Sequence, residues 1–260
     1  MGFSINEGGL LALFVSLTAK EGAAYLVWIL CFLAVIAIGY LLGSVNSAIL
    51  ISKVLYRDDI RRYGSGNAGM TNMLRTYGLK AAGLTLVGDV LKSALAIGFA
   101  GVLFGFGYFR GVSVCAECYI AGLFAVVGHI FPVYYKFKGG KGVLVTAATA
   151  LILSPAVFGI LLLVFVGIVY ASKYVSLGSV SVAFLYPVAL NAYFKVVFAG
   201  MSPSGMISLS SILLALLIIW CHRGNIQRIM DRTERKISFK TKEKELTDES
   251  AKDDTEEIEK

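Results

Sequence analysis

Charged residues are scarce in this chain, and their scarcity excludes a soluble globular domain. They account for 16% of the 260 residues, whereas hydrophobic residues account for 57% and the mean hydropathy is +0.75. Soluble domains carry roughly one charged residue in four. The composition therefore indicates an integral membrane protein, in which each spanning helix needs about 20 largely apolar residues.

Several catalytic signatures are also missing. The chain has no GxSxG elbow and no phosphate-binding P-loop. The fifth residue after His129 is Tyr134 and the fifth after His222 is Gln227, so the HxxxxD pair of many acyltransferases is absent. Residues 64–69 match GxGxxG, but a polar connection rather than a strand precedes them, which argues against a dinucleotide site. We expect no cofactor. We also expect either a substrate that is already activated or a substrate whose own phosphate accepts and donates the proton.

Hydrophobic runs predict an all-α polytopic membrane protein with seven transmembrane helices. The runs lie near residues 24–44, 80–104, 115–135, 141–153, 155–171, 177–197 and 205–221. The fourth is short for a full crossing, so it is either tilted or begins inside a re-entrant or water-lined vestibule. The expected organisation is an N-terminal segment at 1–23, a seven-helix domain at 24–236 and a charged tail at 237–260.

Basic residues are distributed unevenly between the two sets of loops. The loops on one side of the predicted spans hold most of the basic residues, whereas the loops on the other side hold Lys20, Arg110 and Lys195. Because cytoplasmic loops are enriched in Lys and Arg, we expect the N-terminus outside and the C-terminus in the cytoplasm. The net charge of +7 then faces anionic lipid head groups, so membrane lipid explains most of these cations and no nucleic acid is expected as a partner.

The ends of the chain and its cysteines give weaker signals. Residues 9–19 are apolar without a preceding basic residue, and we read them as an interfacial segment or an extension of the first span. The tail is too polar to bury a core and is expected to be disordered. Cys115 and Cys118 form a lone CxxC, and a structural zinc would need two more ligands nearby. Inert buried thiols or an external disulfide remain, and no metal is expected.

A first candidate anion site is the stretch 64–72, GSGNAGMTN. Glycine adopts positive φ without steric cost, so successive backbone N–H groups can converge on an anion. Ser65, Asn67 and Asn72 add neutral donors, and Arg75 offers a planar fork suited to phosphate. Anion binding is the favoured reading, and a tightly packed turn without a ligand is the alternative.

A second candidate anion site is the loop that precedes the fourth run. It contains Lys138, Gly139, Gly140 and Lys141. The helix that follows presents unpaired N–H groups and the positive end of its dipole. Membrane anchoring explains the lysines but not the glycines, so we expect this loop to bind an anion too.

Four ionisable residues within or beside the apolar runs add further hypotheses. Asp89 and Lys92 lie about 15 Å into the second run and three positions apart, either as support for a site or as a mutually neutralising pair. His129 and His222 lie near the cytoplasmic ends of their helices. Either histidine could be a general base or a phosphate-facing donor.

Ordered motifs across residues 24–236 resemble the bacterial acyl-phosphate:glycerol-3-phosphate acyltransferases of phospholipid synthesis. The motifs are Leu42-Gly-Ser44, Arg62-x-Gly-Ser-Gly-Asn67-x-Gly-x-Thr-Asn72-x-x-Arg75, Gly88-Asp89-Val-Leu-Lys92, Gly128-His-Ile-Phe-Pro-Val133, Phe137-Lys-Gly-Gly-Lys-Gly-Val143, Lys173-Tyr-Val-Ser-Leu-x-Ser179 and His222-Arg-x-Asn225-Ile-x-Arg228 with Glu234. Three departures stand out: Asn46 where proline is common, Ala68 and Met70 for the more usual Ile and Ala, and Arg232 for a glycine. The last puts the role of Glu234 in doubt.

The resemblance implies a fold, a reaction and a set of site residues. It implies seven helices in the bacterial cell membrane and a site that faces the cytoplasm. There an acyl group passes from acyl phosphate to the sn-1 hydroxyl of glycerol 3-phosphate and gives lysophosphatidic acid. A peripheral acyltransferase supplies the acyl phosphate. The expected catalytic residues are His222, Ser179 and Ser65, and the expected substrate-binding residues are Ser65, Asn67, Asn72, Arg75, Lys138, Gly139, Gly140, Lys141, His129 and Asn225.

A membrane carrier for an organic phosphate is the alternative function. Such carriers usually bind at the midplane between internal repeats. The motifs here cluster towards one face, and no internal repeat is visible. The enzyme is therefore the favoured reading.

Overall fold

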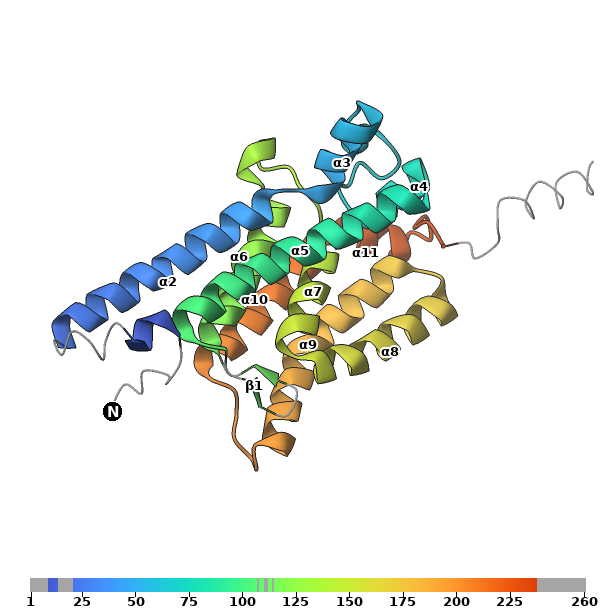
Figure 1. The fold of residues 1–260 in the computed structure, drawn as a ribbon. Coiled ribbons are helices and arrows are strands. Elements are labelled where there is room, and N and C mark those ends of the chain that lie inside the picture. The colour runs from blue at the N-terminus through green and yellow to red at the C-terminus, as the bar shows by residue number, and fades with distance from the viewer. Residues whose placement is uncertain (1–8, 14–20, 107, 110–111, 114, 238–260) are drawn as a thin grey trace, which may run out of the picture.

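The computed structural model describes residues 9–13, 21–106, 108–109, 112–113 and 115–237, and these residues are almost entirely helical (Figure 1). The first long helix is α2 (Glu21–Ser44), and a turn at residues 45–46 connects it to α3 (Ser47–Tyr56). The other elements are η1 (Ile60–Arg62), α4 (Met70–Tyr77), α5 (Leu79–Phe104), β1 (Tyr108–Phe109), β2 (Val112–Ser113), α6 (Ala116–Ile130), η2 (Val133–Tyr135), α7 (Val143–Leu153), α8 (Pro155–Ser172), α9 (Val175–Val197), α10 (Gly205–Cys221) and α11 (Arg223–Met230). The antiparallel pair β1 and β2 is the one departure from the all-α prediction among the described residues.

Five helical segments are long and apolar enough to cross a membrane, and the bent pair of α10 and α11 raises the number to six within the described part of the chain. The five are Gly22–Tyr56, Leu79–Phe104, Ala116–Tyr135, Pro155–Ser172 and Val175–Val197. The remaining apolar helix, α7, has 11 residues, which is well short of a span. The multi-pass helical class is confirmed, while the seventh span stays a prediction.

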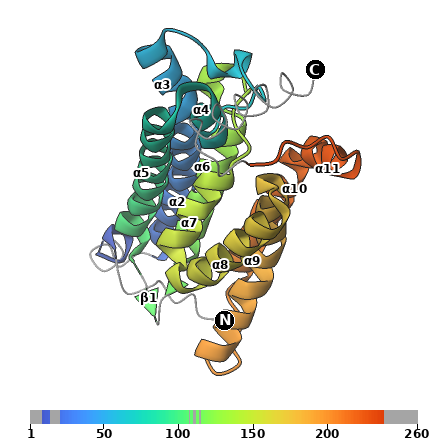
Figure 2. The ribbon, with the colours of Figure 1, turned by 90° about the vertical axis from the view of Figure 1, so that its right-hand side faces the viewer.

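The helices form two groups, which Figure 2 shows side by side. One group contains α2, α5, α6 and α7, and the other contains α8, α9 and α10. They meet where α10 packs against α6 and α8 packs against α7. The short helices α3, α4 and α11 gather at one end of the molecule, and the β1–β2 hairpin lies at the opposite end (Figures 1 and 2). Loops that are distant in sequence therefore come together at the end that carries α3, α4 and α11.

Small residues set the tight packing of α2 against α6. A Cβ on Gly43 would lie 2.1 Å from the carbonyl oxygen of Ala125, and one on Gly128 would lie 2.2 Å from that of Tyr40. Neither position has room for a side chain. Close backbone approach at small residues is a common way for membrane helices to associate. It holds the end of α6, which carries His129, against α2.

The terminal segments and the cysteines are described in part. Residues 10–13 form one helical turn with Leu11 buried, and the rest of the proposed interfacial segment, residues 14–19, lies outside the described residues. The proposed disordered tail also lies outside them, apart from residue 237. Cys115 and Cys118 are free and buried, which matches the inert-thiol reading rather than the disulfide.

Candidate active site

A cavity of about 670 Å³ receives lining residues from both helix groups. Its polar lining comes from the glycine loop at 64–72, from α4, from the start of α7 and α9, and from α11 with residues 233–235. Its apolar lining comes from the bodies of α7, α8 and α9, including Ala150, Phe158, Leu161 and Val182. The cavity thus joins a cationic, hydrogen-bonding region to an oily one.

The structure brings most of the expected site residues to this single cavity. The nine that line it are Ser65, Asn67, Asn72, Arg75, His129, Lys141, Ser179, His222 and Asn225. The lining does not include Lys138, Gly139 or Gly140. Residues up to 160 positions apart in sequence therefore share one pocket, as a site for two phosphoryl groups requires.

Asn72 organises the glycine loop from within. Its Oδ1 accepts a hydrogen bond from the Ser65 amide at 3.1 Å, and its Nδ2 donates to the carbonyls of Tyr63 at 3.0 Å and Asn67 at 3.1 Å. Gly64 has φ +59°, and a Cβ there would lie 2.2 Å from Asn72 Oδ1. The expectation that Asn72 donates to substrate is therefore corrected: its side chain is committed to shaping the loop.

The loop at 138–141 is also organised differently from the expectation. The amide of Gly139 donates to the Ile130 carbonyl and that of Gly140 to the His129 carbonyl, both at 3.1 Å. A Cβ on Gly140 would lie 2.2 Å from His129 Nε2. These glycines therefore permit close packing against the end of α6, and their paired amides do not offer an anion site. The expected role of both glycines is corrected accordingly.

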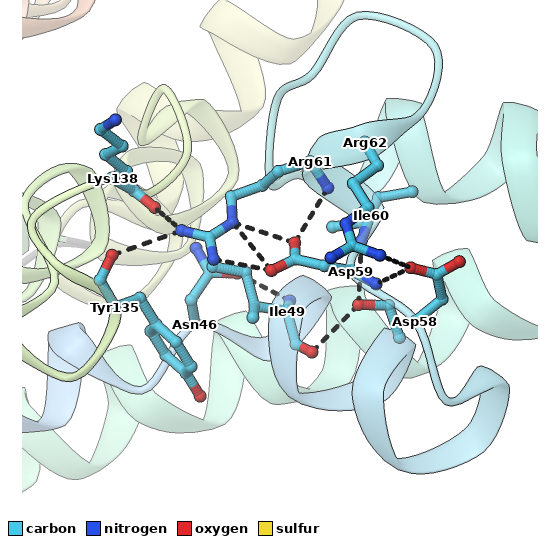
Figure 3. Close-up of polar contacts among 10 residues, drawn as sticks. Asn46, Ile49, Asp58, Asp59, Ile60, Arg61, Arg62, Tyr135 and Lys138 are labelled. Atoms are coloured by element: carbon cyan, nitrogen blue, oxygen red, sulfur yellow. Dashed lines mark hydrogen bonds and ion pairs between the residues drawn. The ribbon is translucent and has the colours of Figure 1, made fainter.

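Arg61 joins this loop to the segment before the glycine loop. Figure 3 shows its guanidinium between the Asp59 carboxylate and two backbone carbonyls, donating at 2.9 Å to Lys138 and at 3.3 Å to Tyr135. The Arg61 hydrogen bonds hold the pKa of Asp59 below its usual range. The Lys138 side chain is exposed and its carbonyl accepts from Arg61, so the expected role of its ammonium in binding stays a prediction.

We call the polar cluster around α11 the outer network; it comprises Lys141, Ser176, Asn225, Arg228 and Glu234. Lys141 Nζ donates to Asn225 Oδ1, and Asn225 Nδ2 donates to Glu234 Oε1 at 2.6 Å. The other donors to Glu234 are Ser176 Oγ at 2.7 Å and Arg228 Nε at 2.7 Å. An ammonium can only donate and an ionised carboxylate can only accept, so these neighbours fix the orientation of the Asn225 amide.

The environment lowers the pKa values of two residues of the outer network that line the cavity, Lys141 and Glu234. Burial lowers the pKa of Lys141, and the attraction of Glu234 opposes this while Arg228 and Arg75 add to it. Burial alone would raise the pKa of Glu234, but hydrogen bonds from Asn225, Ser176 and Arg228 hold it below its ordinary value. Arg75, which is exposed near the end of α4, lines the same cavity as Lys141.

Glu234, Ser176 and Arg228 were absent from the expected site, although their motifs were visible in the sequence. Arg232 adopts φ +57°, a left-handed conformation that suits the glycine expected at this position. The turn nonetheless forms, because the amides of Thr233 and Glu234 donate to the Arg228 carbonyl at 2.8 and 3.1 Å. The Glu234 carboxylate therefore reaches Asn225 although Arg232 replaces the expected glycine.

We call the cluster beneath the 138–141 loop the inner network; it comprises Ser47, Asp89, Lys92 and His129. Asp89 Oδ1 lies 2.8 Å from Lys92 Nζ and accepts from Ser47 Oγ at 2.8 Å. Lys92 Nζ lies 2.8 Å from His129 Nδ1 and donates to the Val45 carbonyl at 3.2 Å. The two charged side chains are 1% and 5% exposed. Both earlier readings hold, because the pair neutralises itself and also supports the cavity that Asp89 and His129 line.

Two further expected residues sit on the other wall. Ser179 is buried in the first turns of α9, where its Oγ donates to the Val175 carbonyl at 2.9 Å and keeps its lone pairs as acceptors. His222 lies where α10 gives way to α11, with Nδ1 at 2.8 Å from the Ile218 carbonyl. A bend of 53° between these two helices turns α11 over the cavity.

A comparison with known protein families shows the family to which the chain belongs. A family model described as "Glycerol-3-phosphate acyltransferase" matches residues 33–232, which include every lining residue except the last three. The chain belongs to the glycerol-3-phosphate acyltransferase family. A glycerol-3-phosphate acyltransferase of Syntrophomonas wolfei is 42% identical over 80% of this chain and 97% of its own length. That of Geobacillus kaustophilus is 39% identical over 79% and 95%.

Solved structures agree with this assignment. The crystal structure of PlsY (YgiH), an integral membrane glycerol 3-phosphate acyltransferase, in its glycerol 3-phosphate form has a TM-score of 0.67 and 32% identity, covering 80% of this chain and 96% of its own. Its lysophosphatidic acid form gives 0.66 and 31%. This acyltransferase is therefore an integral membrane enzyme of phospholipid synthesis, and the family match decides against the phosphate carrier.

Proposed function

We propose that this acyltransferase moves a fatty acyl group from acyl phosphate to the sn-1 hydroxyl of glycerol 3-phosphate, which yields lysophosphatidic acid and phosphate. The observation that carries the proposal is the single cavity, which has cations and hydroxyls in one region and an apolar wall in the other. The two related crystal forms, with glycerol 3-phosphate and with lysophosphatidic acid, support this choice of acceptor and product.

Arg75 and Lys141 hold the two phosphoryl groups. Arg75 supplies a planar fork and Lys141 a point charge, and both line the cavity. Ser65 and Asn67 in the glycine loop and Asn225 in α11 orient the phosphates. Ser179 offers a hydroxyl at the boundary with the apolar wall, where the acyl chain lies against α7, α8 and α9.

Acyl phosphate is an anhydride with a good leaving group, so the reaction needs no nucleophile from the protein. The glycerol oxygen forms a bond to the acyl carbon, and the bond from that carbon to the phosphate oxygen breaks. The hydroxyl proton passes to His222 or to the donor's own phosphate. The protein contributes alignment of the reacting atoms and charge stabilisation of the tetrahedral oxyanion.

The orientation in the membrane follows from charge. Arg61 belongs to η1 and Arg75 to α4. Lys141 donates to Asn225 in the basic helix α11. The helices α3, α4 and α11 lie at one end of the molecule (Figure 1). The positive-inside rule puts this end, and with it the cavity, in the cytoplasm of a bacterial cell. The N-terminus is then outside, and α7 is the fourth and shortest of seven membrane helices. A peripheral acyltransferase delivers acyl phosphate from the cytoplasmic side.

The test compares variants of purified protein in lipid nanodiscs with glycerol 3-phosphate and three donors: palmitoyl phosphate, palmitoyl-CoA and the acyl carrier protein thioester. We expect turnover with palmitoyl phosphate alone. Arg75→Ala and Lys141→Ala should each abolish it with little loss of folded yield, because each removes a phosphate-binding cation. Lys80→Ala removes an exposed cation that does not line the cavity and should leave turnover intact. Retained turnover in either site variant would refute the assignment.

A further inference from the structure

The chain has two histidines, and both line the cavity. His129 comes from the end of α6 and His222 from the junction of α10 and α11. A neutral imidazole donates from one ring nitrogen and accepts at the other. Which nitrogen carries the proton is set by the partner of Nδ1, and the two histidines have partners of opposite kind.

The partner of His129 is an ammonium. Lys92 Nζ lies 2.8 Å from His129 Nδ1, and an ammonium has three donors and no acceptor. Its three donors match three acceptors: Asp89 Oδ1, the Val45 carbonyl and His129 Nδ1. Nδ1 must therefore hold a lone pair, and the ring proton sits on Nε2.

The surroundings of His129 also oppose a doubly protonated ring. An imidazolium would place a second cation 2.8 Å from the Lys92 ammonium, whereas the Asp89 carboxylate oxygen is farther away, at 3.7 Å. At this depth the repulsion is poorly screened. His129 Nε2 lies close to the backbone of Gly140, the residue before Lys141, and His129 and Lys141 both line the cavity.

The partner of His222 is a backbone carbonyl. Ile218 O lies 2.8 Å from Nδ1, and a carbonyl can only accept. The proton of His222 is therefore on Nδ1, and its Nε2 carries the lone pair. The two rings consequently offer opposite chemistry at the same nitrogen.

We propose that Asp89 and Lys92 are positioning residues that lock His129 as an Nε2–H donor for a substrate phosphoryl oxygen, while His222 presents an Nε2 lone pair as an acceptor. This rests on the proposed function for the identity of the anion, but the tautomers are properties of the protein without substrate. One wall of the cavity donates a hydrogen bond and the other accepts one. Two identical side chains acquire separate roles from their buried partners.

The test is the ¹⁵N spectrum of protein labelled at histidine, in lipid nanodiscs at neutral pH without substrate. His129→Gln and His222→Gln each remove one set of ring signals and so assign the spectrum. We expect His129 with a protonated Nε2 and His222 with a protonated Nδ1. Either histidine in the other tautomer, or His129 as an imidazolium, would overturn the proposal. This test leaves Lys92 unchanged, so it does not depend on whether a Lys92 variant folds.

Lys92→Met tests the lock itself. Without the ammonium, the Nδ1 of His129 faces the Asp89 carboxylate, so the ring proton should move to Nδ1 while the His222 signals stay in place. The KM for glycerol 3-phosphate should rise about tenfold, with a smaller change in kcat, because one hydrogen bond to an anion is lost. Lys80→Met removes a cation from the same helix and should change neither signal. An unchanged His129 tautomer in Lys92→Met would remove Lys92 from this role.

Adding glycerol 3-phosphate, and separately inorganic phosphate, to the labelled wild-type protein tests the contact. The Nε2 signal of His129 should shift with both ligands. A shift confined to His222 would overturn the donor role of His129. Absent acyl transfer alongside the expected tautomers would instead count against the proposed function and leave the lock standing, so the two failures are distinguishable.

Discussion

The inner and outer networks border the same cavity and both combine charged with hydrogen-bonding side chains, but the outer network reaches solvent at Arg228. In the inner network, Asp89 and Lys92 are 1% and 5% exposed and every donor of the ammonium is matched. In the outer network, Arg228 is 48% exposed and Glu234 9%. The comparison indicates that the buried cluster positions other groups, whereas the more open cluster can exchange its partners for those of a substrate.

The energetic consequence also differs between them. Removing one member of a buried ion pair leaves an uncompensated charge in a medium that cannot solvate it. Removing one member of a partly exposed pair leaves a charge that water can still reach. Mutations in the inner network should therefore lower stability most, in addition to any effect on substrate binding through His129, whereas mutations in the outer network should mainly change activity.

The largest expected effect is that of Asp89→Ala on stability. The variant strands the Lys92 ammonium inside the helix bundle and should lower the free energy of unfolding by about 3–5 kcal/mol. Thermal unfolding in one detergent would measure the loss. The double variant Asp89→Asn with Lys92→Met removes both charges and should lose less. A double variant as unstable as Asp89→Ala would contradict the charge argument and point to packing.

A smaller effect is expected from Glu234→Gln. The neutral amide weakens the hydrogen bonds that orient Asn225, so kcat/KM should fall about tenfold while the unfolding temperature barely changes. Steady-state kinetics with palmitoyl phosphate would show this. Asp231→Asn removes the same charge from an exposed neighbour that does not line the cavity, and it should match wild type. Equal losses in both variants would mean that net charge, rather than the contact with Asn225, matters.

The smallest effect is a pH dependence that distinguishes the two cations. Because burial lowers the pKa of Lys141, its positive charge is lost as pH rises, at a lower pH than for an ordinary lysine near 10.4. The KM for glycerol 3-phosphate should therefore rise a few-fold before pH reaches the ordinary lysine pKa. Lys141→Arg keeps its charge at these pH values, so its KM should stay flat. A wild-type KM that is independent of pH would show that Lys141 does not contact the phosphate.

Much of the site was visible in the sequence as composition and spacing. Apolar runs of about 20 residues predict spans, and the glycine, lysine and histidine motifs at their ends predict the meeting of Arg75, Lys141 and Asn225 in one pocket, which the structure confirms. The seven-span expectation is less secure. The fourth run forms an 11-residue helix, and the first continues through a turn as far as Tyr56. Hydropathy does not reveal where an apolar run bends.

The use of individual donors was harder to foresee. Nothing in the sequence indicated partners for the backbone N–H groups of Gly139 and Gly140 or for the side-chain amide of Asn72. In the structure each of these donors pairs with a backbone carbonyl. Those partners come from the end of α6 and from the segments around the glycine loop. No local pattern shows which donor will pair, because the acceptor is supplied by a segment that arrives through folding.

The sequence by itself determined the membrane class, the family motifs and the set of polar residues available for two phosphates, because these depend on residue type and order. The tertiary structure decided which of those residues face the cavity, which hold its walls, and which nitrogen of each histidine bears the proton. The physical reason is that each donor and acceptor has a limited number of hydrogen bonds. The packed neighbours of the two histidines, Lys92 for His129 and Ile218 for His222, determine how those bonds are assigned.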